Sequence, residues 1–153
     1  MDSLIIEKVK KLIQDNDEFY EFSTFGDGTD IKIIEGVEEK LGLCFSPSYK
    51  WWLSNYGGGC VGGSELFSVY EDYVDDIPLP GGDIVYMRNL NLNSGHYKSN
   101  ELVFMENEQD IFYFDLNQKS ENGEYFIFEK NTNRLFAIDF FDFLLKIFKL
   151  YGG

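Results

Sequence analysis

Hydrophobic residues recur at intervals of three and four along the first part of the chain, and this spacing predicts three helices. The first is expected over residues 4–15. The second begins after Asp30, whose side chain can cap it, and ends at Gly42, a residue suited to the left-handed conformation that closes helices. A third carries Pro47 in its first turn, where a missing N–H costs nothing, and Gly57 closes it.

The hydrophobic period changes to two in the rest of the chain, which is typical of strands. Six such segments, separated by Gly, Asn and Asp clusters, span residues 65–69, 83–87, 101–105, 110–116, 124–129 and 135–138. Their spacing predicts a meander of mainly antiparallel hairpins instead of βαβ units. A closing helix begins at Asp139, and Asp142 stands at the reciprocal capping position. That helix is apolar nearly all round, so it is expected in the core, with a partner-binding face as the alternative.

Together these elements predict one α+β domain covering residues 1–153. It would contain N-terminal helices, a mainly antiparallel sheet of about six strands, and a closing C-terminal helix. A chain of 153 residues can bury one substantial core, and its 15 Phe and 10 Tyr residues would supply much of it.

Acidic residues outnumber basic ones by 27 to 13, which gives a formal net charge of -14. Such a chain is repelled by nucleic acid and by anionic membrane surfaces. A basic protein partner is favoured because opposite charges speed the encounter of two molecules. Solubility alone is an equally good reason for the acidity, so charge by itself leaves both interpretations open.

The two cysteines, Cys44 and Cys60, are too few for a secreted disulfide framework and lack the spacing of a zinc site. No apolar run approaches the roughly 20 residues that a membrane-spanning helix needs. The N-terminal residues also lack the apolar core of a signal peptide. We therefore expect a cytoplasmic protein with reduced cysteines.

Motifs for catalysis, cofactors or metals are weak throughout the chain. The glycine-rich run 57–63 leaves a helix and enters a strand, whereas a phosphate loop leads into a helix and carries a lysine. His96 is the only histidine and lies in a polar loop without a nucleophile motif. Residues 26–30 match a calcium loop poorly. We predict no enzyme activity, no cofactor and no metal, and a hydrolase that uses paired carboxylates is the weakest alternative.

An acidic and aromatic segment follows the first predicted strand. Its composition suits a basic protein surface, since rings can anchor a partner while carboxylates steer it. The predicted partner-binding residues are Tyr70, Glu71, Asp72, Tyr73, Asp75 and Asp76. The alternative is a solvated acidic loop, which is what most charge runs are. Three more carboxylates in a predicted hairpin turn either extend this acidic face or point elsewhere: Glu106, Glu108 and Asp110.

One ordered set of residues carries a family resemblance. It contains an isoleucine, a glutamate ahead of Leu-Gly, a tyrosine, an aromatic-leucine pair, two glycines and a Leu-Phe pair. In this chain these are Ile34, Glu38, Leu41, Gly42, Tyr49, Trp52, Leu53, Gly57, Gly58, Leu66 and Phe67. The C-terminal part adds Asp115, Ala137, Phe140, Phe143 and Leu144. This order resembles the SUKH superfamily, which includes a fungal cell-wall-synthesis regulator and many bacterial immunity proteins.

The chain departs from the family pattern at two turns. Phe45 and Ser46 stand where the family has Leu-Pro, with the proline one place later at Pro47. Gly57 and Gly58 replace an Asn-Gly pair.

The resemblance implies a non-catalytic binding protein. Its leading function would be immunity, in which the protein binds a polymorphic toxin, in many cases a nuclease, and covers the active surface of that toxin. The basic groove of a nuclease would suit a partner of net charge -14. The alternative is a cytosolic regulatory scaffold that binds host proteins with no toxin involved.

Overall fold

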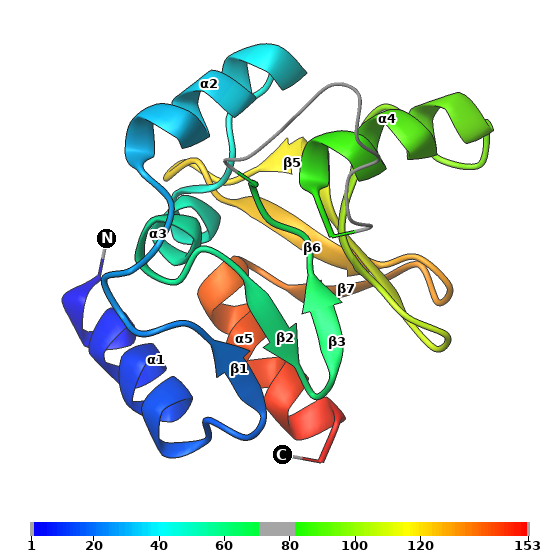
Figure 1. Cartoon of the computed structure of the whole chain (residues 1–153). Coiled ribbons are helices and arrows are strands. Elements are labelled where there is room, and N and C mark those ends of the chain that lie inside the picture. The colour runs from blue at the N-terminus through cyan, green and yellow to red at the C-terminus, as the bar shows by residue number, and fades with distance from the viewer. Residues whose placement is uncertain (1, 71–81, 153) are drawn as a thin grey trace.

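The computed structural model describes residues 2–70 and 82–152, and in this part of the chain five helices accompany a seven-stranded sheet (Figure 1). The helices are α1 (Ser3–Asp15), α2 (Ile31–Leu41), α3 (Pro47–Asn55), α4 (Ile84–Ser94) and α5 (Phe140–Leu150). The strands are β1 (Tyr20–Phe22), β2 (Gly59–Val61), β3 (Ser64–Leu66), β4 (Glu101–Glu106), β5 (Ile111–Lys119), β6 (Tyr125–Glu129) and β7 (Arg134–Ala137). They lie side by side in chain order, each antiparallel to its neighbours. The predicted α+β class is confirmed.

The N-terminal helices begin and end where their capping residues indicate. Asp2 accepts a hydrogen bond from the Leu4 N–H at 2.9 Å, and Asp30 accepts one from the Lys32 N–H at 2.8 Å. Gly42 ends α2 in the left-handed conformation, with φ at +70°. Pro47 opens α3 as expected.

The first two strands were not expected from the sequence. Residues 20–22 lie in the acidic stretch that follows α1, and residues 59–61 lie in the glycine-rich run. Each strand is only three residues long, so neither contains enough alternation to be recognised alone. Both strands exist because β1 pairs with β2 and β2 pairs with β3. The sheet therefore has seven strands where about six were expected.

The prediction of a strand over residues 83–87 is wrong, because these residues open helix α4. Asp83 is buried and caps the helix by accepting a hydrogen bond from the Tyr86 N–H at 2.8 Å. The Ile84 N–H donates to the Ser68 carbonyl at 2.9 Å, which fixes the start of the helix against the end of the first sheet hairpin. Capping and this distant contact outweigh the strand propensity of the β-branched residues.

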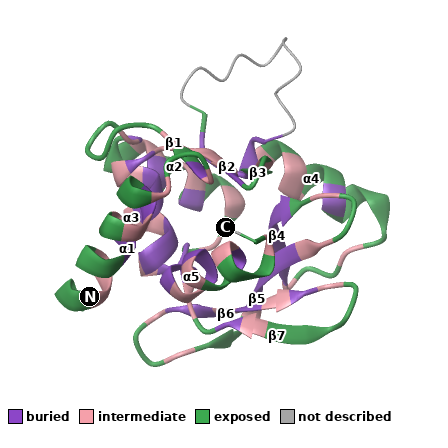
Figure 2. Ribbon diagram, turned by 90° about the horizontal axis from the view of Figure 1, so that it is seen from below, coloured by how far each residue is buried: buried purple, intermediate pink, exposed green. Residues whose placement is uncertain are grey.

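The core lies between the sheet and helix α5, as Figure 2 shows by the concentration of buried residues there. Phe104 and Phe114 project from the sheet and Phe140 and Phe143 from the helix, with ring centroids 4.5–6.2 Å apart. Helices α1 and α3 pack against α5. The expected burial of the last helix is confirmed, although Leu150 near its end remains 53% exposed.

Buried polar side chains join α3, the β5–β6 hairpin and the start of α5. The Glu124 carboxylate accepts hydrogen bonds from the Ser48 N–H at 2.9 Å and from the Ser48 hydroxyl at 2.6 Å. The same hydroxyl accepts a bond from the Phe140 N–H at 3.0 Å. Ser46 also accepts a bond from the Tyr125 N–H at 3.0 Å. These contacts connect residues that lie far apart in the sequence.

Two glycines give a matched test of this packing. Gly28 lies so close to the carbonyl groups of Leu53 and Ser54 that a methyl group would collide with them, whereas Gly36 in α2 faces open space. We expect Gly28→Ala to lower the free energy of unfolding by about 1–3 kcal/mol, because overpacking displaces backbone. Gly36→Ala should raise it by about 0.5–1 kcal/mol, because alanine favours the helix. Urea denaturation of the two variants measures both changes, and equal effects would contradict this packing.

Candidate functional site

The described residues on either side of positions 71–81, which include most of the predicted acidic segment, are hydrogen-bonded to each other beside the sheet. The Ser68 N–H donates to the Gly82 carbonyl at 2.9 Å, so the chain leaves and returns at adjacent positions. The Tyr70 hydroxyl donates to Glu65 of β3 at 2.8 Å, and the Tyr70 side chain lies at the surface with 36% of its area exposed. Burial, followed by this bond to Glu65, raises the pKa of Tyr70 to about 12. Its phenol therefore remains neutral at physiological pH.

Of the predicted partner-binding residues, only Tyr70 belongs to the part of the chain that the structure describes. The others lie outside the described residues: Glu71, Asp72, Tyr73, Asp75 and Asp76. Their assignment to a binding surface stays a prediction. The described residues that flank positions 71–81 contact Glu65, through Tyr70, and Ser68, through Gly82.

A row of side chains that includes two glutamates crosses the first three strands beside Tyr70. Glu21 pairs with Cys60, and Cys60 pairs with Glu65, so the three side chains lie on the same face of β1, β2 and β3. Both glutamates are exposed, while Cys60 is half-buried. Burial raises the pKa of the Cys60 thiol, and the charges of Glu65 and Glu21 raise it further. We call Glu21, Cys60 and Glu65 the acidic row.

The hairpin between β4 and β5 contributes one carboxylate to the same region. The register that pairs Leu66 with Met105 brings Glu106 opposite Glu65, at the end of the acidic row. Glu106 is exposed, as is Glu108 in the turn. Asp110 is instead engaged locally, because it accepts a hydrogen bond from the Tyr151 hydroxyl at 3.0 Å. Of the three carboxylates predicted in this turn, Glu106 therefore extends the acidic row, Glu108 is exposed in the turn, and Asp110 bonds to Tyr151.

The glycine-rich run forms one wall of a surface groove of about 520 Å³. Gly57, Gly58 and Gly59 all have positive φ values, between 78° and 152°. A side chain at Gly59 would collide with the Glu21 carbonyl, so glycine is required there for β1 and β2 to pair. Asp27 and Tyr70 line the same groove. The prediction that the glycines end a helix and form a turn is confirmed. The glycine backbone lies in the same groove as Tyr70, the first residue of the predicted acidic segment.

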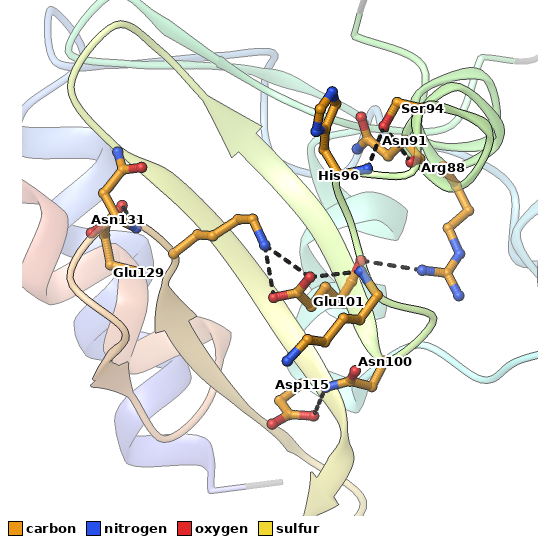
Figure 3. Close-up of polar contacts among 11 residues, drawn as sticks. Arg88, Asn91, Ser94, His96, Asn100, Glu101, Asp115, Glu129 and Asn131 are labelled. Atoms are coloured by element: carbon orange, nitrogen blue, oxygen red, sulfur yellow. Dashed lines mark hydrogen bonds and ion pairs between the residues drawn. The ribbon is translucent and has the colours of Figure 1, made fainter.

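A second polar cluster lies where α4 meets β4, and its members bond to one another (Figure 3). The buried Glu101 carboxylate accepts hydrogen bonds from the Lys130 ammonium at 2.9 and 3.0 Å and from the Lys98 N–H at 2.7 Å. The Arg88 guanidinium donates to the carbonyls of Ser99 and Glu101 at 2.6 and 3.1 Å. These partners satisfy the charged groups, so the cluster is suited to hold α4 on the sheet and not to act on a substrate.

Asp115 stands at the position of the strand-end aspartate of the family pattern. Its carboxylate bonds to neighbouring residues of the chain. Burial acts to raise its pKa, but hydrogen bonds from Asn100, Asn117 and Gln118 outweigh burial and leave the pKa below its ordinary value. Its oxygens accept these bonds at 2.8, 3.0 and 2.7 Å. An ionised carboxylate with this many donors is a poor general base.

The remaining candidates for chemistry are dispersed. His96 lies exposed in the loop after α4, as expected, and Cys44 is exposed elsewhere on the surface. Within residues 2–70 and 82–152, no three His, Cys, Asp or Glu side chains gather as a metal site would require. None of the helices in this described part has the length and apolarity to cross a membrane.

The acidic row could not be located by sequence reasoning, because two of its three strands, β1 and β2, were not recognised. The only available signal was the alternation Tyr20, Glu21, Phe22, in which a charged residue lies between two aromatic ones. Three residues are too few for such a pattern to stand out from the surrounding acidic stretch.

Comparison with protein-family models identifies the family of the chain. The family model SUKH_6, described as SMI1-KNR4 cell-wall, matches residues 31–144, which is more than half of the chain. No curated protein matches the chain significantly. The matched range includes Tyr70, Glu65 and the glycine-rich run, whereas β1 with Glu21 precedes it.

The acidic row predicts how the reactivity of Cys60 depends on pH. In a Cys44→Ser background, Glu65→Gln should move the pH profile of Cys60 alkylation by iodoacetamide to lower pH, because a charge that raises the thiol pKa is removed. Glu108→Gln removes an equal charge from the nearby turn and serves as the control. Equal profiles for the two variants would contradict the placement of Glu65 beside Cys60.

Proposed function

Because the chain belongs to the SUKH family, we propose that it is an immunity protein that binds a polymorphic toxin, and specifically a nuclease, and covers its active surface. The proposal needs no catalytic residue, since inhibition is stoichiometric. The observation that carries it is the family match combined with a net charge of -14. A nuclease must hold a polyanion in a basic groove, and an acidic protein is electrostatically complementary to such a groove.

The surface next to the acidic segment supports this proposal. The acidic row and Glu106 place carboxylates on the sheet beside Tyr70, where the segment begins. Charges arranged in this way would attract a basic partner from a distance and hinder acidic ones. We assign the steering role to Glu71, Asp72, Asp75 and Asp76.

Tyrosines next to these charges would supply contact area. Glu65 holds the Tyr70 hydroxyl, so the ring loses little further freedom on binding and can act as an anchor. We assign the same role to Tyr73. The expected interface thus combines two aromatic anchors with surrounding acidic groups.

The regulatory scaffold remains the second candidate, and gene position separates the two. A gene immediately downstream of a large toxin gene favours immunity, whereas an isolated gene favours a scaffold that binds host proteins. Both candidates use a non-catalytic binding surface.

Co-expression with the C-terminal domain of the neighbouring toxin tests the function directly. We expect the protein to restore growth of cells that produce the toxin domain and to co-purify with it as a stoichiometric complex. A catalytically inactive toxin domain should co-purify equally well, since binding requires no turnover. Absence of both rescue and co-purification would remove the support for immunity.

Association kinetics test the assigned residues. Changing Glu71→Gln, Asp72→Asn, Asp75→Asn and Asp76→Asn together should slow association with the toxin domain about tenfold at low salt and flatten its salt dependence. Stopped-flow fluorescence at several ionic strengths measures both effects.

A variant with the same change in net charge provides the control for these kinetics. It replaces four exposed glutamates elsewhere with glutamine: Glu7, Glu35, Glu39 and Glu121. The control should associate much faster than the segment variant, because local charge at the interface dominates steering. If both variants behave alike, the acidic segment is not the steering surface.

A further inference from the structure

A groove of about 520 Å³ lies between helix α1 and the outermost strand of the sheet. Lys10, Ile13 and Gln14 line it from the helix, and Asp17 lines it from the turn that follows. Tyr20 and Phe22 line it from β1. Further aromatic and polar residues line it near the start of the next loop and at the end of α3: Ser23, Thr24, Phe25 and Tyr56. Figure 1 shows α1 alongside β1 at the end of the sheet. The groove thus lies next to the first strand of the sheet.

Strand β1 is the first strand in the sheet order and pairs only with β2 among the described strands. The Phe19 carbonyl accepts a hydrogen bond from the Gly62 N–H at 2.9 Å, so residue 19 faces β2. Backbone groups alternate in direction along an antiparallel strand, so residue 21 also faces β2, while residues 20 and 22 face away from it. The Tyr20 carbonyl and the Phe22 N–H and carbonyl are therefore directed to the free edge, beside the groove.

The side chains of β1 alternate between the two faces of the sheet. Tyr20 and Phe22 point to the aromatic interior, where Phe22 contacts Trp52 and Tyr56 with ring centroids 5.4 and 5.5 Å apart. Glu21 lies on the other face, at the end of the acidic row. A strand added to β1 would therefore place every second side chain in the groove and the intervening one beside Glu21.

From this arrangement we infer that the groove binds an extended segment of a partner polypeptide, which adds to β1 as a further strand and carries alternating apolar and basic residues. The free backbone groups recognise extended chain, as in other cases of strand addition. The aromatic lining takes the apolar side chains, and Glu21 pairs with the basic one. The site goes beyond toxin neutralisation and stands whether or not that function holds.

The electrostatics at the groove agree with a basic segment. Asp17 lines the groove, and Glu21 is exposed on the strand that borders it. Lys10 is the basic residue of the lining, but its ammonium lies 3.5 Å from Glu7 and 4.2 Å from the centre of the Phe25 ring. A carboxylate and an aromatic face thus already compensate this cation.

Synthetic hexapeptides test the site. The probe alternates isoleucine and lysine and carries a fluorescein label, an acetylated N-terminus and an amidated C-terminus. The control peptide has the same composition with the three isoleucines consecutive, which abolishes the period of two. We expect the alternating peptide to bind more tightly in fluorescence anisotropy at physiological salt. In nuclear magnetic resonance spectra of the full chain it should shift the amide signals of residues 20–24 most strongly.

Two tryptophan substitutions, one in the groove and one on α4, test where the peptide binds. Gln14→Trp places a large side chain in the groove from an exposed helix position and should weaken peptide binding at least about tenfold. Asn89→Trp makes a comparable change at an exposed position of α4 and should leave binding unchanged. Glu21→Gln should weaken binding a few-fold by removing the cross-strand charge pair.

Three outcomes would overturn the inference. The first is that the alternating peptide fails to bind at millimolar concentration, and the second is that the control peptide binds as tightly. The third is that the Gln14→Trp variant binds the alternating peptide with unchanged affinity. Circular dichroism of each variant confirms that it is folded, so a loss of binding reports on the groove. Failure of toxin rescue with intact peptide binding would leave this site in place, and the converse result would remove only this site.

Discussion

The buried hydrogen bonds between Ser48 and Glu124 are the contact on which the arrangement of the elements depends. Ser48 lies in the first turn of α3 and Glu124 precedes β6, and the Ser48 hydroxyl also receives the Phe140 N–H at the start of α5. Burial raises the pKa of Glu124, while the two bonds from Ser48 act to lower it. A carboxyl group in this position is costly to bury without both donors, so α3, the hairpin and α5 must come together in one arrangement.

This arrangement determines which surfaces are available for binding. Helix α5 fills the interior face of the sheet with phenylalanine, and α3 packs against α5. Consequently the first three strands keep their other face toward solvent, where Glu21 and Glu65 lie in one row. Ser68 and Gly82, which lie on either side of residues 71–81, are hydrogen-bonded to each other beside the same part of the sheet. The core therefore carries an acidic surface on the solvent side of the first three strands.

Strand β1 takes part in both proposed binding surfaces. Its outward-facing Glu21 belongs to the acidic row, while its inward-facing Phe22 and its free backbone edge border the groove next to α1. The two surfaces differ in chemistry. The first offers charge and aromatic anchors to a folded basic partner, and the second offers backbone hydrogen bonds to an extended chain.

Sequence patterns were enough to predict the fold class, the ends of α1, α2 and α3, the later strands of the sheet, and the burial of α5. These features depend on contacts within a few residues, such as the Asp30 cap and the left-handed Gly42, or on long periodic patterns. The acidic composition and the segment after Tyr70 were also apparent. Contacts between distant residues were needed to establish that residues 20–22 and 59–61 are strands and that residue 84 begins a helix. Such short elements take their conformation from hydrogen bonds to distant residues, and a local pattern carries no information about those partners.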